Sequence, residues 1–266
     1  MLNGLRIMMA AAMAMTASTA MAQSREEPLC TDRPSRSNNV CTVPEGRIQI
    51  ESDLINWTRD DADGLRTDVI AYTSPTMKLG IGPATDVQTT FTPYTESRTR
   101  DPEGTTRYGG FGDVFVRVKQ RLTSENAGLE VGLMPYVKIP TAGRRIGNGA
   151  WEGGVSIPIQ YALPSGFSLG ASPEIDAVLD QDGRGRHAYV VGTLNVGKTI
   201  TDRLAVGIEA WTGQDLDPSG AERQYSADVF ATWLVAPLLQ LDAGANFGLN
   251  EETPDAQIYV GVSTRF

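Results

Sequence analysis

The chain has 266 residues, of which 41% are hydrophobic and 21% are charged, and its formal net charge at pH 7 is −9. This acidic balance argues against nucleic acid as a partner, because such binding depends on neutralising phosphates with Lys and Arg. No segment approaches the ~20 consecutive apolar residues that a membrane-spanning helix needs, which excludes a helical membrane protein.

Residues 1–22 have the features of a secretory signal peptide. A basic residue, Arg6, precedes an apolar stretch that begins at Ile7, and Ala20-Met21-Ala22 stands before Gln23. Small residues at this spacing mark a cleavage site, so we expect removal after Ala22 and export from the cytoplasm.

Residues 23–46 are rich in proline and too irregular to form a strand. The two cysteines of the chain, Cys30 and Cys41, both lie here and predict a disulfide in an oxidising compartment. In the loop-entropy model, closing the ten residues between them contributes about 3 kcal/mol. Our hypothesis is that this segment folds into or under the lumen of a barrel as a plug.

From residue 47 to residue 266 the chain alternates between apolar and polar residues. In "GDVFVRVKQRL", for example, Val114, Val116 and Val118 alternate with Arg117 and Lys119. Such segments exceed the 5 to 6 residues of an ordinary strand and match the ~10-residue units of outer-membrane barrels. We therefore predict an all-β fold, an antiparallel, up-and-down transmembrane β-barrel of about twelve strands. The expected strands lie near residues 47 to 58, 65 to 79, 84 to 97, 110 to 122, 128 to 140, 151 to 162, 166 to 179, 187 to 199, 203 to 213, 224 to 235, 238 to 249 and 256 to 266.

The connections support an even number of strands with both termini in the periplasm, since short turns alternate with longer outer loops. The first strand pair is the weakest part of this register, because "IESDLINWTR" fits either face. The expected short turns are "LGIGPAT", "TSENAG", "LPSG", "TITD" and "APL". The expected outer loops are "TRDDADG", "RTRDPEGTTRYGG", "TAGRRIGNGA", "DQDGRGR", "GQDLDPSGAE" and "NEETPD".

Aromatic residues fall at both ends of the expected strands. Trp151 and Tyr225 begin strands on the outer side, while Tyr161, Trp233 and Phe266 end strands on the inner side. Two aromatic belts are typical of a protein that crosses a bilayer. The alternative, a soluble β-sandwich with core aromatics, leaves the long polar face of each strand without a purpose.

The chain ends in "AQIYVGVSTRF", in which Ile258, Val260, Val262 and Phe266 share one face. This last strand must pair with the first one, because no backbone group can stay unpaired in hydrocarbon. The ending resembles the C-terminal signal by which Gram-negative bacteria recognise outer-membrane barrels. We therefore assign Tyr259 and Phe266 to a membrane insertion signal and expect the barrel assembly machinery as a partner.

Several stretches together resemble one protein family over essentially the whole mature chain. They are "TDRP" followed by "TVPEGRIQIE", then "GFGDVFVRVKQRL", "PYVKIPT" and the close "TPDAQIYVGVSTRF". The chain is similar to the phenol-degradation MetA-pathway family of outer-membrane transporter-like β-barrel proteins. The resemblance implies barrels that handle hydrophobic substrates and a link to the breakdown of aromatic compounds. It supplies no set of functional residues, and the paired cysteines stand outside the general pattern.

Candidate catalytic residues are few. The one histidine, His187, begins a strand whose Ala188 and Val190 are expected to face lipid, so His187 points to the lumen or rim. A barrel lipase would need it on the lipid side beside an activated serine. The loop "DQDGRGR" lacks the ligand spacing of a calcium loop, which leaves surface contact with divalent cations or lipopolysaccharide as its alternative role. We expect no catalytic site, no cofactor and no metal.

Charged residues are predicted to line the lumen. Two interpretations remain open: an ion-pair lattice that fills a small barrel, or a selectivity determinant for a passing solute. The candidates are Arg117, Lys119, Arg121, Lys138, Glu130, Glu174 and Asp176.

These observations favour a passive channel in the outer membrane for small, hydrophobic or aromatic molecules. A twelve-stranded barrel is intermediate in bore between small filled barrels and open porins, so small solutes can pass. The main alternative is a structural or adhesive barrel whose loops contact lipopolysaccharide or other partners. A barrel lipase is the third hypothesis.

Overall fold

The computed structural model describes residues 27–62, 64–125 and 127–266. The predicted signal peptide, residues 1–22, lies outside them. Within the described ranges, no helix is long and apolar enough to cross a membrane. The one helical element of the described residues is a single 3-10 turn, η1 (Pro164–Gly166).

Strands make up the rest of the regular structure. The first eight are β1 (Ile48–Ala62), β2 (Leu65–Tyr72), β3 (Ser74–Gly82), β4 (Thr85–Thr90), β5 (Tyr94–Asp101), β6 (Gly104–Gly110), β7 (Val114–Arg121) and β8 (Leu129–Ile139). The others are β9 (Glu152–Ser156), β10 (Ile159–Ala162), β11 (Phe167–Ala171), β12 (Glu174–Leu179), β13 (Arg186–Thr199), β14 (Leu204–Asp215), β15 (Glu222–Ala236), β16 (Leu239–Gly248) and β17 (Ala256–Arg265).

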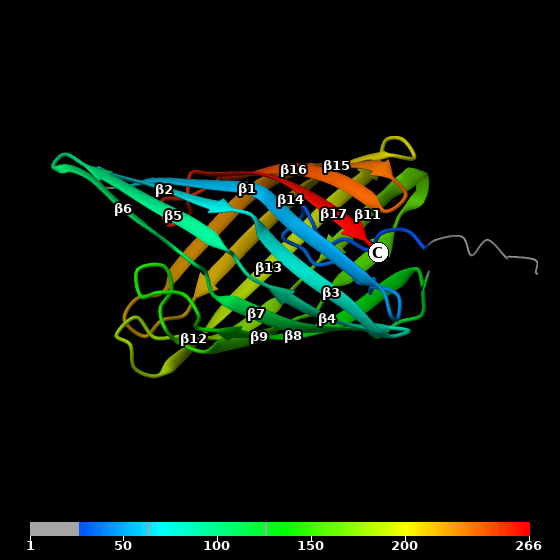
Figure 1. Ribbon diagram of the computed structural model, residues 1–266, viewed down its shortest axis with the longest axis horizontal. Coiled ribbons are helices and arrows are strands. Elements are labelled where there is room, and N and C mark those ends of the chain that lie inside the picture. Colours follow the sequence, from blue (N-terminus) through cyan, green and yellow to red (C-terminus); the bar gives the residue numbers. More distant parts are fainter. Residues whose placement is uncertain (1–26, 63, 126) are drawn as a thin grey trace, which may run out of the picture.

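These segments form one closed antiparallel barrel of twelve strands, as predicted (Figure 1). Five barrel strands are each interrupted once, so that β2 and β3, β4 and β5, β6 and β7, β9 and β10, and β11 and β12 are halves of one strand. The barrel closes where β1 pairs with β17, from Gln49 opposite Arg265 to Arg59 opposite Ala256. The last strand therefore completes the hydrogen bonding that hydrocarbon requires.

Four neighbouring strands change face partway along their length. In β1 the register shifts between Asp53 and Ile55. The junction of β2 and β3 contains Thr73 at a φ of 60°. The chain also leaves the ladder between β4 and β5 and between β6 and β7. An extra residue in a strand moves every following side chain to the opposite face, so the outer parts of these strands present different residues to lipid.

Two expected outer loops are instead strands. Most of "TRDDADG" belongs to β1, which continues to Ala62, and "RTRDPEGTTRYGG" forms most of the β5–β6 hairpin. The hairpin projects beyond the barrel at the left of Figure 1. Its tight turn is fixed because the Asp101 carboxylate accepts the amides of Glu103 and Gly104 at 2.8 and 2.7 Å. The hydrophobic pattern missed these strands because neither of their faces is apolar.

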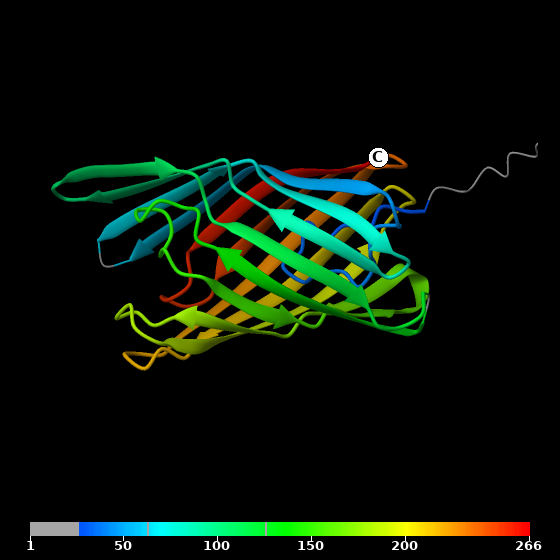
Figure 2. The same ribbon diagram turned by 60° about the horizontal axis from the view of Figure 1, so that its bottom comes forward.

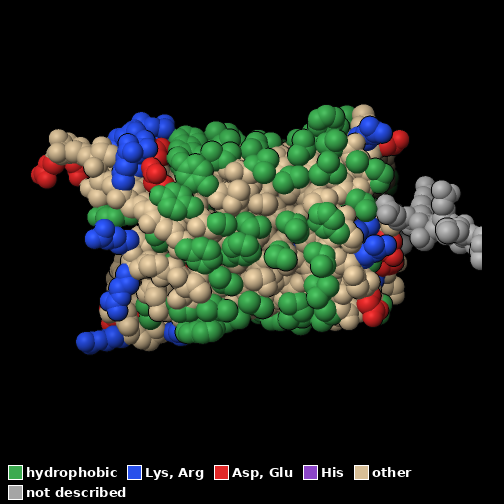
Figure 3. Space-filling view, in the orientation of Figure 1, with side chains coloured by type: hydrophobic (Ala, Val, Ile, Leu, Met, Phe, Trp, Pro, Cys, Tyr) green, Lys and Arg blue, Asp and Glu red, His purple; other side chains and the backbone are tan. Residues whose placement is uncertain are grey.

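The outer surface carries an apolar band with charged residues at both ends (Figure 3). Within the band, Leu194 is 59% exposed and Ile208 is 62% exposed. The predicted belt residues are all exposed: Trp151 and Tyr225 on the outer side, and Tyr161, Trp233 and Phe266 on the inner side.

Buried hydrophobic side chains are correspondingly rare. In the described ranges they are Cys30, Val40, Val43, Met134 and Tyr259, whereas the buried polar and charged residues are far more numerous. This distribution is the reverse of a soluble core and contradicts the β-sandwich alternative.

A charge placed in the middle of the apolar band should destabilise the barrel. Val229 lies at the centre of β15 and is 47% exposed. We expect Val229→Arg to lower the free energy of unfolding by about 2 to 4 kcal/mol, because a charge at the bilayer midplane is poorly solvated. Urea unfolding in phospholipid vesicles, followed by Trp fluorescence, measures this. The control is Leu249→Arg, at the outer end, where we expect less than about 1 kcal/mol. Equal losses would contradict the placement of the bilayer.

Candidate functional site in the barrel lumen

The N-terminal residues 27–46 are here called the lumen segment, and most of them lie inside the barrel (Figures 1 and 2). The predicted disulfide between Cys30 and Cys41 is present, with its Cα atoms 5.7 Å apart. Val40 and Val43 are fully buried, and the Val43 amide donates to the Asp86 carboxylate of the wall at 2.9 Å. The segment is thus an ordered part of the lumen.

Asp32 forms the first ionic anchor of this segment. Its carboxylate pairs with Lys78 Nζ at 2.5 Å and with Lys119 Nζ. Lys78 also pairs with Glu51 at 2.5 Å, and that carboxylate accepts the backbone amide of Asp32 at 3.0 Å. Two buried ammonium groups are therefore balanced by two carboxylates, one of which comes from the lumen segment. Burial alone would raise the pKa of Asp32, but Lys119 and Lys78 outweigh it and hold that pKa well below its usual range.

Arg33 forms the second anchor. Its guanidinium pairs with Asp53 at 2.6 Å and with Asp242 at 2.7 Å, and so joins the first barrel strand to β16. The group also lies over the Tyr259 ring, 5.8 Å from its centroid. A Cβ atom at residue 261 would stand 2.1 Å from Arg33 Nη2, so Gly261 is required for this approach.

Glu209 of β14 holds the next turn of the segment. Its carboxylate accepts the backbone amides of Arg36 at 2.9 Å and Ser37 at 3.2 Å, together with the Ser35 hydroxyl. The Tyr259 hydroxyl donates to the Pro34 carbonyl at 2.7 Å. One wall carboxylate thus replaces the water that these amides would otherwise bind.

An aromatic cavity opens above the lumen segment, on the side of the outer loops. It has a volume of about 300 Å³, and Trp211 and Tyr189 line it beside Thr253 and Pro254 of the last outer loop. The Arg36 guanidinium lies 4.4 Å from the Trp211 ring centroid and 3.5 Å from the Asp228 carboxylate. We call this space the outer vestibule. It combines flat apolar faces with a cation.

The structure does not bring the seven predicted lumen charges into one site. At the inner end, Arg121 pairs with Glu125 at 2.7 Å. Glu130 lies on the neighbouring strand β8. Near the outer end, Lys138 pairs with Glu152 at 2.6 Å.

The other four candidates lie midway along the lumen. Lys119 pairs with Asp32, as described above. Arg117 lies over the rings of Phe115 and Tyr136, at 5.2 and 5.9 Å from their centroids. Glu174 and Asp176 occupy β12. Glu174 interacts electrostatically with Arg117, and both carboxylates interact with Tyr136.

Most of the residues that hold the lumen segment were not among the predicted site residues. Glu209, Asp228 and Asp242 all occupy polar positions in the alternation of the last strands, which was the available signal. Their partners are Arg and Ser residues of an irregular segment about two hundred residues away, and alternation says nothing of such pairs. Tyr259 and Phe266, named together as an insertion signal, lie on opposite faces: Tyr259 is buried in the lumen and Phe266 is 65% exposed.

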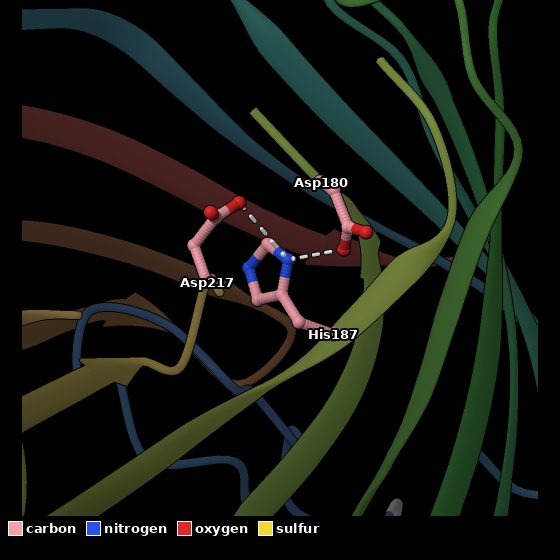
Figure 4. Close-up of side chains that lie close together, drawn as sticks. All are labelled: Asp180, His187 and Asp217. Atoms are coloured by element: carbon pink, nitrogen blue, oxygen red, sulfur yellow. Dashed lines mark hydrogen bonds and ion pairs between the residues drawn. The ribbon is translucent and has the colours of Figure 1, made fainter. Parts of the chain in front are cut away.

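His187 belongs to a charged cluster at the outer rim (Figure 4). Its Nδ1 atom lies 2.9 Å from Asp180 and 3.3 Å from Asp217, and its Nε2 atom lies 2.7 Å from Asp215. Asp217 also accepts the amide of Gln181 at 2.7 Å, so the cluster joins two outer loops. No serine in the described part of the chain is hydrogen-bonded to His187, which leaves the lipase hypothesis without a supporting contact.

Comparisons with known proteins agree with this architecture. Residues 31–266 match the family described as "Putative MetA-pathway of phenol degradation". Among solved structures, an outer membrane channel from Pseudomonas putida F1 is similar, with a TM-score of 0.66 and 14% identity over 88% of this chain and 100% of that one. The β domain of the Bordetella autotransporter BrkA has a TM-score of 0.55 and 9% identity over 84% of this chain and 100% of that one. No curated protein matches the chain.

Removal of the Arg33 anchor should loosen the lumen segment. In Arg33→Ala the carboxylates of Asp53 and Asp242 lose their partner in a site where they are largely buried. We expect the free energy of unfolding to fall by about 3 kcal/mol and the single-channel conductance in planar bilayers to rise. The double variant R33A/D242N should recover part of the stability. The control Arg203→Ala, in an exposed inner turn, should change neither quantity. Unchanged conductance in a folded Arg33→Ala protein would contradict this role.

The Asp32 anchor should also persist in mild acid. Because the pKa of Asp32 is lowered from an unfolded value of about 3.9, its stabilising contribution is complete above about pH 5 and is lost progressively as pH falls through the lowered value. We expect equal conductance at pH 7 and pH 5 in the wild type, and higher conductance at pH 7 in Asp32→Asn. The control is Asp202→Asn, in an exposed turn. A conductance of Asp32→Asn equal to that of this control would refute the prediction.

Proposed function

This chain belongs to the phenol-degradation MetA-pathway family, and from that membership and its lumen we propose a passive outer-membrane channel for small, hydrophobic or aromatic molecules. The observation that carries the proposal is the outer vestibule, where the Arg36 guanidinium lies over the Trp211 ring and Tyr189 lines the same cavity. Aromatic faces attract apolar rings, and a guanidinium binds carboxylates. An aromatic carboxylate satisfies both groups at once.

The lumen segment acts, in this proposal, as a plug that narrows the path. Between it and the wall lies a cavity of about 210 Å³ lined by Thr76, Thr90 and Arg117. On the side nearer the periplasm, a second cavity of about 200 Å³ is lined by Ser168, Lys198 and Phe230. A solute that leaves the outer vestibule reaches these spaces only if the segment shifts. The domain boundaries that we propose are residues 23–46 for the plug and 47–266 for the barrel.

The seven lumen charges divide by role under this proposal. Arg117 lines a cavity next to two aromatic rings, so it is the best candidate for contact with a solute. Lys119 and Lys138 are already held by carboxylates and serve mainly to compensate charge. Glu174 acts on Arg117 and Asp176 on the neighbouring Tyr136, while Arg121 and Glu130 belong to the inner mouth.

The partners that fit this placement are outer-membrane lipid, lipopolysaccharide, the barrel assembly machinery and the solute itself. The exposed Phe266 at the chain end is the residue that we propose the assembly machinery recognises. No enzymatic activity is proposed, since His187 is engaged by three aspartates. The similar structure from Pseudomonas putida is described as an outer membrane channel, which supports the same class of function.

Solute flux into liposomes that carry the refolded protein tests the proposal. We expect benzoate to enter faster than a sugar of similar mass; benzoate is used because neutral phenol crosses lipid unaided. Trp211→Ala should reduce the benzoate rate while leaving the sugar rate unchanged, because only the aromatic solute uses the indole face. Trp233→Ala, at the exposed inner belt, is the matched control.

Deletion of residues 25–42 separates a closed channel from a structural barrel. Flux of both solutes should rise in the deleted protein if the lumen segment obstructs the path. If neither solute enters in the wild type or in a correctly folded deletion, the channel proposal fails and the structural or adhesive alternative stands.

A further inference from the structure

Basic side chains gather on one outward face at the outer end of the barrel, next to the apolar band (Figure 3). The strand register shows how they meet. One row of paired residues crosses four strands. In β1 and β2 it contains Arg59 opposite Asp68, and in β5 and β6 it continues with Arg98 opposite Asp68 and Arg107 opposite Arg98. One row farther out, Arg66 lies opposite Arg100. We call these five residues, Arg59, Arg66, Arg98, Arg100 and Arg107, the arginine patch.

The patch faces the lipid side of the wall and not the lumen. Trp57, two residues before Arg59, lies opposite Ile258, which is 47% exposed within the apolar band. On the same face, Tyr72 and Tyr94 are both exposed, with ring centroids 5.9 Å apart. The arginines therefore begin directly beyond the aromatic belt, at the depth of lipid headgroups. Because the long outer loops lie at this end, the headgroups are those of the outer leaflet.

The patch carries more positive charge than its own acidic neighbours compensate. Asp68 is shared by Arg59 at 3.1 Å, Arg66 at 3.4 Å and Arg100 at 3.8 Å. Glu96 pairs with Arg98 at 3.2 Å. With Asp61, which lies opposite Arg66, the face holds three carboxylates against five guanidinium groups.

An N–H group of the patch also donates no hydrogen bond within the protein. The Nε atom of Arg98 is buried and has no hydrogen-bond partner. Asp68 additionally accepts the Trp57 indole N–H at 3.0 Å, so this one carboxylate is already crowded with donors. Such a surface, on a chain of net charge −9, fits an anionic ligand.

We propose that the arginine patch binds the phosphate groups of lipid A, the lipid anchor of lipopolysaccharide. Guanidinium groups bind phosphate oxygens in bidentate pairs, and five of them on a ladder of strands can engage both phosphates of one molecule. The acyl chains would then lie against Trp57, Tyr72 and Tyr94 in the apolar band. This inference rests on the outer-membrane placement in the proposed function, but it is independent of whether a solute passes the lumen.

Binding of bisphosphorylated lipid A to the detergent-refolded protein tests the proposal. The variant R66Q/R98Q/R100Q/R107Q should bind at least about tenfold more weakly, because several charge-assisted contacts are lost. The matched control R144Q/R145Q/R184Q/R186Q removes four exposed arginines of the outer loops and should stay within about twofold of the wild type. Equal weakening of both variants, or no weakening of the patch variant, would overturn the proposal.

Two further arms identify the ligand. Dephosphorylated lipid A should bind the wild type as weakly as phosphorylated lipid A binds the patch variant. Inorganic phosphate at millimolar concentration should not displace lipid A; displacement would show a site for free phosphate and overturn the lipid assignment. Benzoate flux should be the same in the patch variant and the wild type, so a failure of this inference is distinguishable from a failure of the channel. If the fourfold variant does not fold, Arg100→Gln alone should still weaken binding by about threefold.

Discussion

The structure depends on one constraint: in hydrocarbon, every backbone polar group must find its partner within the protein. A sheet meets this demand only by closing, which the pairing of β1 with β17 achieves. Closure places the apolar face of each strand outside and leaves the polar face to fill a narrow interior. The interior therefore differs from a soluble core, because it contains many buried charged side chains, and each of these charges needs a partner.

The lumen segment supplies those partners. Without Asp32, Lys119 would lose the carboxylate that it pairs with, while Lys78 would keep only Glu51. Without Arg33, Asp53 and Asp242 would both lose their ion-pair partner. The segment and the wall are therefore complementary, and neither is electrostatically complete alone. In the proposed channel, occlusion and selectivity would use the same groups, since any solute that passes would move through the field that holds the segment. The disulfide limits how far the segment can spread while it remains in place.

Much of the fold followed from the sequence, because alternation in a barrel is a local property. Val114, Val116 and Val118 predict their strand without knowledge of any other. The β5–β6 hairpin was missed because it leaves the bilayer, and without lipid there is no selection for an apolar face. The disulfide was predicted because two cysteines allow one pairing. The contacts of Asp32, Arg33 and Glu209 were not predictable, since they depend on the path of an irregular segment through a closed barrel.

The ambiguous first strand shows how a single added residue determines which side of the barrel wall a charged side chain faces. Glu51, Asp53 and Arg59 are all odd-numbered, so an unbroken β1 would point all three side chains into the lumen. The register shift at Leu54 turns Arg59 outward. The same holds for the three neighbouring barrel strands, in each of which a lumen residue and an arginine of the patch would share a face if the strand were unbroken. The pairs are Lys78 and Arg66 in β2–β3, Gln88 and Arg98 in β4–β5, and Lys119 and Arg107 in β6–β7. Without these breaks, the five arginines would project inward above the lumen segment. The breaks therefore give one wall a polar lumen near the periplasm and a cationic outer face at the opposite end, so two binding surfaces arise from the same four strands.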